Sequence, residues 1–301
     1  MIRITHIINP VKVSESSDLY KSQPITFASI LKAKEYTDSL CKINLCTTQF
    51  QEDKAIIPVG FFILSNLTRS VLDVNPKLSG KKLPLIADIF DKFNEVPDSD
   101  YYIYTNADIA LMPYFYNVVH QYLMQGYDAI VINRRRLSKS YADELCLEMM
   151  YADIGKSHPG FDCFVIKKDL INSLILDDIC VGIPFVEVAL VHNLCSLAKK
   201  PLFLPDAHLT FHIGLDVMPK RNQDYYWHNR LAYFTKVQPV LKPLFNLNKF
   251  PYSFLPIHKR AMKWILNPGL FTSNYLELES KSIRNKIIFI LNEWRWRFLQ
   301  K

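Results

Sequence analysis

The chain has 301 residues, of which 49% are hydrophobic and 22% are charged. This is the composition of an ordinary globular protein, and it excludes disordered, collagen-like and disulfide-scaffold classes. Only 8 glycines occur, and neither a Walker loop nor a dinucleotide-binding loop is present. The six cysteines form no C-x-x-C pair, which argues against structural zinc. Because no apolar run reaches about 18 residues and the N-terminus lacks a signal-peptide core, we expect a soluble, cytoplasmic protein.

The net charge of +7 is unevenly distributed along the chain. Residues 220–301 contain fifteen Lys and Arg against four Asp and Glu, a balance of +11, so residues 1–219 carry −4. Such asymmetry is typical of a basic region that meets an anionic membrane, nucleic acid or acidic glycan. A solvated basic face would produce the same pattern.

Short β-rich runs alternate with helical patterns in the first two-thirds of the chain. In chain order, these are a strand over 2–8, a helix over 24–38, a strand over 42–47, a helix over 82–93, a strand over 101–105, a helix over 112–124 and a strand over 129–133. This alternation predicts an α/β fold with a mainly parallel sheet sandwiched by helices.

Polar residues stand at the carboxyl ends of the predicted strands. They are Asn9, Thr47, Thr48, Asn106, Asp108 and Asn133. Because ligands bind beyond the carboxyl ends of such strands, we expect these side chains to converge on one crevice.

The pattern changes after residue 235, where prolines interrupt it and aromatic residues are interleaved with Lys and Arg. Helical spacing returns over 282–299. We therefore expect a catalytic domain over 1–235 and a basic, aromatic extension over 236–301 that ends in an amphipathic helix.

The sharpest local signal is the run YYIYTNADIAL over 101–111. An apolar strand here ends in Asn106 and Asp108, which point toward the same open edge. Asp can bind a divalent cation through oxygen, and the cation can neutralise a diphosphate. A helix-capping turn would use the same residue types.

This run resembles the DxD region of glycosyltransferases of the GT-A fold, which use nucleotide-sugar donors. Asn106, Ala107 and Asp108 match the motif, with Asn in place of its first Asp, as in an N-x-D-I-x-L variant. The run HPGFDCFVI over 158–166 is similar to the G-x-D-x-F strand that borders the acceptor pocket. The run GIPFVE over 182–187 is similar to the segment that opens a helix and presents an acidic residue to the acceptor. The resemblance covers residues 1–230.

The run AHLTFHIG over 207–214 is predicted to be a strand with His208 and His212 on one face. In several GT-A enzymes a late histidine completes the metal site, and His212 resembles that residue. The resemblance thus implies Mn²⁺ or Mg²⁺ held by Asp108 and His212, with imidazole favouring Mn²⁺. Asn106 removes one charged ligand of the motif, and a hydrogen-bonded core histidine is the alternative.

The resemblance implies transfer of a sugar from a nucleotide-sugar donor to a glycan or lipid-linked acceptor in surface-polysaccharide synthesis. Glu187 is the expected catalytic base and Asp162 the second candidate; direct attack with Glu187 as base would invert the anomeric configuration. One of the three arginines at 134–136 is expected to reach the diphosphate. The expected donor-binding residues are Asn9, Pro10, Thr48, Arg69, Lys82, Asn106, Asp108 and Arg134.

The basic, aromatic residues 259–301 are expected to meet an anionic membrane surface, which would make the protein peripheral on the inner face of the membrane. A C-terminal helix packed on the catalytic domain is the alternative.

Three other functions stay open at this stage. A nucleotidyltransferase would share the sheet and the metal, but the glycine-rich loop that it needs after Ile8 is missing. Asn106 allows a GT-A scaffold without catalysis. A nucleic-acid-binding protein could use the basic tail, but no recognised motif supports it, so no nucleic-acid partner is expected.

Overall fold

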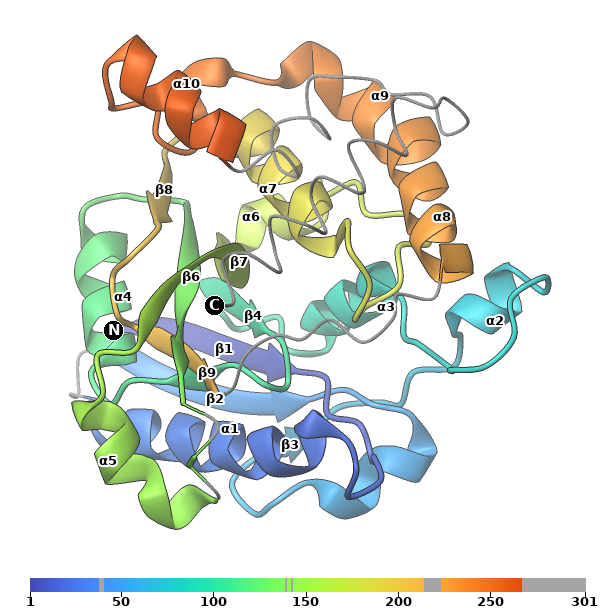
Figure 1. Ribbon diagram of the computed structural model, residues 1–301, viewed down its shortest axis with the longest axis vertical. Coiled ribbons are helices and arrows are strands. Elements are labelled where there is room, and N and C mark those ends of the chain that lie inside the picture. The colour runs from blue at the N-terminus through green and yellow to red at the C-terminus, as the bar shows by residue number, and fades with distance from the viewer. Residues whose placement is uncertain (38–40, 139, 142, 214–222, 267–301) are drawn as a thin grey trace.

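The computed structural model describes residues 1–37, 41–138, 140–141, 143–213 and 223–266 (Figure 1). In these residues a nine-stranded sheet has the order β3-β2-β1-β4-β7-β6-β9-β5, with β8 paired to β6. The strands are β1 (Ile2–Ile8), β2 (Cys41–Thr47), β3 (Phe62–Ile63), β4 (Tyr101–Thr105), β5 (Ala110–Leu111), β6 (Ala129–Leu137), β7 (Lys156–Lys167), β8 (Pro201–Leu204) and β9 (Thr210–Ile213).

The helical elements connect these strands and follow them. They are α1 (Asp18–Glu35), η1 (Gln51–Ile56), α2 (Val71–Val74), α3 (Ile86–Asp91), η2 (Lys92–Glu95), α4 (Phe115–Met124), η3 (Glu144–Cys146), α5 (Leu147–Ala152), α6 (Lys168–Ile171), α7 (Val186–Leu197), α8 (Gln223–Ala232), η4 (Tyr233–Val237), α9 (Gln238–Leu241), η5 (Lys242–Leu244), η6 (Leu247–Lys249) and α10 (Ile257–Leu266).

Parallel pairing dominates the sheet. β1 pairs in parallel with β2 and β4, and β2 pairs in parallel with β3. β7 lies antiparallel between β4 and β6, so β6 runs in the same direction as β4. β8 and β9 are parallel to β6, and β5 is antiparallel to β9. The predicted α/β class with a mainly parallel sheet is confirmed.

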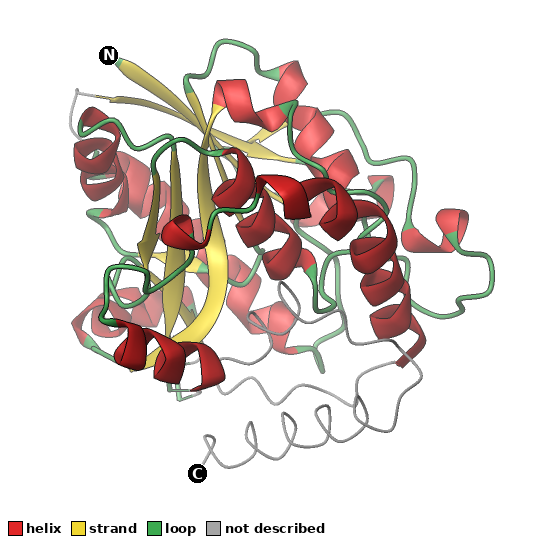
Figure 2. Ribbon diagram, turned by 90° about the horizontal axis from the view of Figure 1, so that it is seen from above, coloured by secondary structure: helices red, strands yellow, loops and turns green. Residues whose placement is uncertain are grey.

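Helices cover both faces of the sheet, because alternate residues of each strand point to opposite sides (Figure 2). On one face Ile4 and Ile8 of β1 pack in a cluster with Phe27 of α1 and Phe115 of α4. On the other face the β1 residue Ile7 belongs to a second cluster, which contains buried residues of α3, α7, η4 and α9.

The predicted strands over 2–8 and 101–105 match β1 and β4, but three helices begin elsewhere than predicted. α1 begins six residues before Pro24, because the Ser17 hydroxyl accepts a hydrogen bond from Leu19 N and caps an earlier start. α3 begins at Ile86, because Pro84 and Leu85 are extended and form isolated bridges with other segments. α4 begins at Phe115, after Pro113.

Two strand predictions near the sheet edge were also wrong. β6 continues to Leu137 rather than ending at Asn133, so its three arginines lie within the strand, where Arg135 and Arg136 pair with β7 and β9. β9 begins only at Thr210, and His208 has a left-handed backbone with φ of 47°. His208 therefore lies outside the strand, and the prediction that it shares a strand face with His212 does not hold.

The helical stretch formed by α8, η4 and α9 runs through residue 235, the predicted domain boundary. Beyond that residue, Val237, Leu241 and Phe250 are buried in the same core cluster as α7. None of the helices in the described ranges combines the length and apolarity needed to cross a bilayer. The amphipathic helix predicted over 282–299 lies outside the described residues.

Candidate functional site

Five strands reach the same level of the sheet. Ile8 of β1 is paired with Thr47 of β2 and Thr105 of β4, Thr105 is paired with Cys163 of β7, and Cys163 is paired with Ile132 of β6. The next residues beyond these pairs are Asn9, Thr48, Asn106, Asp162 and Asn133. Asn9, Thr48 and Asn106 therefore follow parallel strands at one edge of the sheet, as the topology of an α/β fold predicts, and Asp162 and Asn133 lie at the same level within β7 and β6.

Asp108 and His212 meet at this edge. The pairing of Ala110 with Phe211 between β5 and β9 brings the two segments together. His212 Nε2 lies 3.2 Å from Asp108 Oδ2, and the exposed fractions of the two side chains are 9% and 26%. Two residues 104 positions apart in the chain thus share one partly enclosed position.

Asn106 is oriented by the strand that precedes it. The Tyr104 hydroxyl donates a hydrogen bond of 3.0 Å to Asn106 Oδ1. Burial raises the pKa of Tyr104 well above its ordinary value, and the nearby carboxylates of Asp108 and Asp162 raise it further. Tyr104 therefore remains a hydrogen-bond donor, and it occupies the Asn106 amide oxygen.

Arg134 and Asp162 form a buried ion pair. Arg134 Nη1 lies 2.5 Å from Asp162 Oδ1, and only 11% and 8% of the two side chains are exposed. This pairing supports Asp162 as the residue that holds Arg134, because a general base must be free to reach an acceptor hydroxyl.

The other two arginines of β6 have different surroundings. Arg135 donates to the carbonyl oxygens of Ile154 and Gly155 and pairs with Asp206. Arg136 is paired in register with His212, so the two side chains leave the sheet on the same face. Its Nε and Nη1 are buried and have no hydrogen-bond partner in the described part of the chain.

Sequence reasoning expected one of the three arginines at 134–136 to reach the diphosphate and named Arg134 as donor-binding, but it did not single out Arg136. The signal that identifies Arg136 is the two-residue period of a strand, which places positions 134 and 136 on one face and 135 on the other. That signal was hidden because the predicted strand ended before the arginines.

Glu187 lies in the first turn of α7. A Cβ added to Gly160 of β7 would lie 3.3 Å from Glu187 Oε2 and 2.8 Å from His158 Cε1. His158 Nδ1 accepts a 2.9 Å hydrogen bond from Gly160 N, which closes this bend of β7. Glycine at 160 thus lets the β7 backbone approach the carboxylate of Glu187 closely.

Asn9 and Thr48 join the ends of β1 and β2. Asn9 Nδ2 donates a 2.6 Å hydrogen bond to the Thr48 carbonyl oxygen. The Thr48 side chain is fully buried, and its hydroxyl donates to the Ser65 carbonyl oxygen at 3.3 Å. Pro10 is also buried. Thr48 therefore has a structural role at this end of the sheet, and Asn9 is the more accessible of the two residues.

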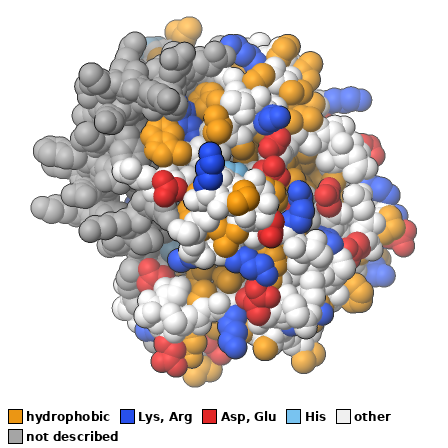
Figure 3. Space-filling view, turned by 90° about the vertical axis from the view of Figure 1, so that its right-hand side faces the viewer, with side chains coloured by type: hydrophobic (Ala, Val, Ile, Leu, Met, Phe, Trp, Pro, Cys, Tyr) orange, Lys and Arg blue, Asp and Glu red, His pale blue; other side chains and the backbone are white. Residues whose placement is uncertain are grey.

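Arg69 and Lys82 are both held in ion pairs on the α3 side of the molecule. Arg69 makes a two-pronged contact with Asp88, whose carboxylate raises the pKa of Arg69, and Asp178 lies 3.9 Å away. Lys82 Nζ lies 2.9 Å from Glu52 Oε1 and stands over the Phe50 ring. Acidic and basic side chains are interspersed across this face (Figure 3). The charges of both predicted donor-binding residues are thus already balanced.

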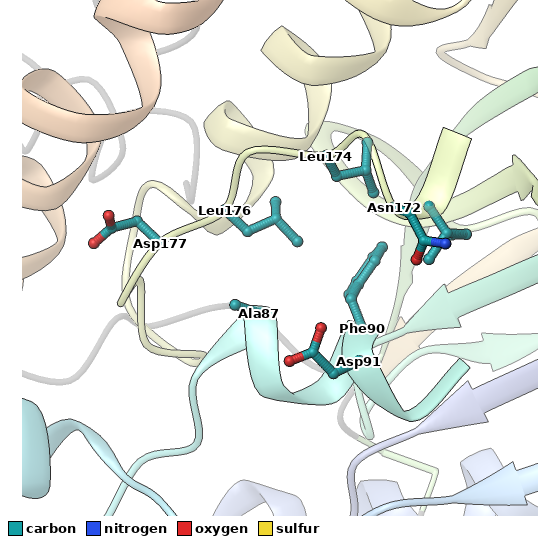
Figure 4. A pocket seen from close by; sticks show the side chains of 8 residues that line it. Ala87, Phe90, Asp91, Asn172, Leu174, Leu176 and Asp177 are labelled. Carbon is teal, nitrogen blue, oxygen red and sulfur yellow. The ribbon is translucent and has the colours of Figure 1, made fainter. Parts of the chain in front are cut away.

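A pocket of about 220 Å³ lies between α3 and the segment after α6 (Figure 4). Apolar side chains such as Phe90 and Leu176 line it, together with the carboxylate of Asp91. None of the sequence-predicted site residues contributes to its lining.

No protein-family model matches the chain, and no curated protein matches its sequence. Its fold is similar to that of S. aureus TarS 1-349, solved in complex with UDP-GlcNAc, at a TM-score of 0.49 and 9% identity over 98% of this chain and 78% of that one. It is also similar to the mannosyltransferase PcManGT from Pyrobaculum calidifontis, solved with GDP-Man and Mn²⁺. The TM-score is 0.45, and the identity is 12% over 99% of this chain and 82% of that one. A third similar structure is glucosyl-3-phosphoglycerate synthase from Mycobacterium tuberculosis, solved with Mg²⁺ and UDP. The TM-score is 0.40, and the identity is 12% over 77% of this chain and 79% of that one. Scores of this size identify neither the family nor the activity of this chain.

Proposed function

We propose that this protein is a glycosyltransferase that moves a sugar from a nucleotide-sugar donor to a glycan or lipid-linked acceptor. The observation that carries the proposal is the 3.2 Å approach of Asp108 and His212 at the sheet edge. Beside this pair we assign hydrogen-bond donors to Asn106 and Arg136, and from the start of α7 a carboxylate to Glu187. These are the groups that bind a diphosphate and activate a hydroxyl.

The Asp108 and His212 pair fits a divalent ion. Ligands at adjacent corners of an octahedral ion with bonds of about 2.1 Å are separated by about 3 Å, close to the observed spacing. No group of three or more His, Cys, Asp or Glu in the described ranges could hold a metal, so the remaining ligands would be water and diphosphate oxygens. An imidazole ligand favours Mn²⁺ over Mg²⁺. When bound, the ion would neutralise charge on the departing diphosphate.

Arg136 is our candidate for the cation that binds the diphosphate. Its buried Nε and Nη1 lack hydrogen-bond partners in the described chain, and the strand register places it beside His212. A guanidinium matches phosphate oxygens with two parallel N–H donors. The amide NH₂ of Asn106 provides a further donor at the same edge, and Asn9 borders the nucleoside side.

Glu187 is our candidate for the base. It accepts the proton of the acceptor hydroxyl as the oxygen forms a bond to the anomeric carbon, and the bond from that carbon to the diphosphate oxygen breaks. The leaving group is the nucleoside diphosphate, and the anomeric configuration inverts. Asp162, the second candidate, serves better to fix Arg134.

The test of this function uses Glu187→Gln, with Glu148→Gln as the matched control. Glu148 also lies in the first turn of a helix, α5, and its side chain is exposed. In the sequence it is distant from the residues at the sheet edge. Nucleotide release is measured with Mn²⁺ and UDP-glucose, UDP-N-acetylglucosamine or GDP-mannose, with water as acceptor. Glu187→Gln should lower kcat by about 10²- to 10⁴-fold with the donor KM unchanged. Normal turnover in Glu187→Gln would refute the role of Glu187.

We also propose that the protein works at the inner face of a membrane, where a lipid-linked acceptor for surface polysaccharide would be found. Phe254 and Ile257 are 76% and 78% exposed, and the exposed Lys259 and Lys263 lie on α10. Exposed apolar and basic side chains together suit an anionic bilayer. The protein should float with vesicles that contain phosphatidylglycerol, and the double variant Lys259→Glu, Lys263→Glu should float less; equal flotation would contradict the proposal.

A further inference from the structure

The turn that precedes α7 has an unusual backbone. Phe185, the residue before the first turn of α7, has φ of 92° and ψ of −14°. A residue with a Cβ adopts this left-handed region only when its surroundings hold it there. Gly182, three residues earlier, has φ of 83° and can adopt it without a side-chain clash.

Aromatic rings from α8 and η4 surround Phe185. Its ring centroid lies 5.6 Å from that of Tyr226, 5.5 Å from that of Tyr233 and 6.0 Å from that of Phe234. Only 5% of Phe185 is exposed. The strained residue is therefore anchored by a helical segment that is 38 or more residues further along the chain.

The α8 residue Asn229 binds the same turn through the backbone. Its side chain is fully buried. Asn229 Oδ1 accepts a 2.8 Å hydrogen bond from Cys180 N, and Nδ2 donates to the carbonyl oxygens of Cys180 at 2.9 Å and Pro184 at 3.1 Å. One amide group thus ties together the two ends of the turn over 180–184.

We propose that Asn229 is a positioning residue for Glu187, and that it acts through the 180–185 turn and Phe185. Glu187 follows Phe185 by two residues, so the direction in which α7 begins decides where its carboxylate lies. That carboxylate lies against the bend of β7 at Gly160. This inference rests on the proposed function of Glu187.

Asn193 of α7 provides a matched control. It too is fully buried, and its amide binds Ile175 N at 2.7 Å and the carbonyl oxygens of Ile175 and Ala189 at 2.8 Å. Replacing either asparagine by alanine removes buried hydrogen bonds of the same kind: three for Asn193, and four for Asn229, which also donates to the Ile183 carbonyl oxygen at 3.4 Å. Of these two asparagines, Asn229 is the one that binds the turn leading to Glu187.

The experiment compares full-length Asn229→Ala and Asn193→Ala. Urea unfolding measures their stability, and hydrogen exchange measures protection of the amides over 180–188. Nucleotide release is followed with Mn²⁺ and whichever of UDP-glucose, UDP-N-acetylglucosamine and GDP-mannose the wild type hydrolyses fastest. We expect similar losses of stability. Asn229→Ala alone should lose protection over 180–188 and at least 10-fold in kcat, with the donor KM within twofold of wild type.

Equal kcat values for the two variants, or unchanged exchange over 180–188 in Asn229→Ala, would overturn the inference. If Asn229→Ala does not fold, Phe185→Leu replaces it, because leucine keeps an apolar side chain in place but loses the ring contacts. Phe185→Leu should lower kcat at least threefold with an unchanged donor KM. A normal kcat in Phe185→Leu would also overturn the inference. The Glu187→Gln variant separates the two proposals. If its kcat falls while Asn229→Ala matches Asn193→Ala, the proposed base stands and the positioning role fails; if it turns over normally, both fail.

Discussion

The backbone of Phe185 is strained in a way that glycine would not be. Its φ of 92° is unfavourable for any residue with a Cβ, and its ring packing offsets the strain. Phe185→Ala removes the packing and keeps the strain, whereas Phe185→Gly removes both. We expect the glycine variant to be more stable than the alanine variant by about 1 kcal/mol in urea unfolding. Equal stability, or a more stable alanine variant, would contradict the left-handed backbone.

Two buried histidines make stability depend on pH. Burial lowers the pKa of His6 to about 3 and that of His192 to about 4. In the unfolded chain these histidines have a pKa of about 6.5. Below that pH the unfolded chain therefore binds protons at both histidines, whereas the folded protein does not. Stability is therefore complete above about pH 6.5 and is lost as pH falls toward 4, by about 2 kcal/mol for each histidine between pH 7 and 5.

The His192→Phe variant isolates one of these contributions. Phenylalanine keeps a ring in contact with Phe245 but cannot gain a proton. Between pH 7 and 5, this variant should lose about 2 kcal/mol less stability than the wild type. Urea unfolding at both pH values measures this difference, and an identical pH dependence would show that His192 does not resist protonation.

At the scale of elements, β6 sorts three consecutive arginines into three roles. Arg134 pairs with Asp162, Arg135 fastens β6 to the loop before β7, and Arg136 presents a guanidinium beside His212. The buried Nε and Nη1 of Arg136 lack partners in the described chain, and burying such groups is costly. We therefore expect Arg136 to lower stability in the free protein, and under the proposed function a bound diphosphate would supply the partners that it lacks.

Arg136→Met should therefore leave stability unchanged or raise it, while weakening nucleoside diphosphate binding. A charge-assisted hydrogen bond contributes about 1.5–3 kcal/mol, so the dissociation constant should rise about 10-fold or more. Arg135→Met is the control, because it should lower stability and leave the affinity within twofold. Calorimetry and urea unfolding of both variants give the two quantities. The reverse pattern would assign the anion contact to Arg135.

The strands β1 and β4 were predictable because local patterns define them. β1 and β4 are apolar runs that end in polar residues, and both match their predicted bounds. α3 was predicted four residues too early, because its amphipathic spacing extends into Pro84 and Leu85. Those residues are extended because they bridge to Ser70 and Cys180, contacts that no local pattern reveals.

In the candidate site, too, some residues belong to local sequence patterns and others depend on distant contacts. Asp108 and Glu187 belong to short motifs that a sequence displays, but the approach of Asp108 to His212 depends on the distant pairing of β5 with β9. Asn229 was missed because a single asparagine in a helix has no distinguishing pattern. Its importance comes from a turn 45 or more residues away, which only the folded chain brings to it.

At the scale of the whole molecule, the candidate site joins two parts of the chain. The parallel strands β1, β2 and β4 present Asn9, Asn106 and Asp108 at one edge of the sheet. The later elements β9, α7 and α8 add His212, Glu187 and the turn that leads to Glu187. Asp108 and His212 meet where the two parts join, so the proposed function depends most directly on this pair.

The most direct test is calorimetry with UDP, GDP, CDP and CMP, each with and without Mn²⁺, on the wild type and on Asp108→Ala and His212→Ala. We predict that one nucleoside diphosphate binds the wild type at least 10-fold more tightly with Mn²⁺ than without it. Both variants should fold and lose that gain. Binding that is equally tight without Mn²⁺ or in Asp108→Ala, or no binding of any nucleotide to the wild type, would contradict a metal-assisted glycosyltransferase site at Asp108 and His212.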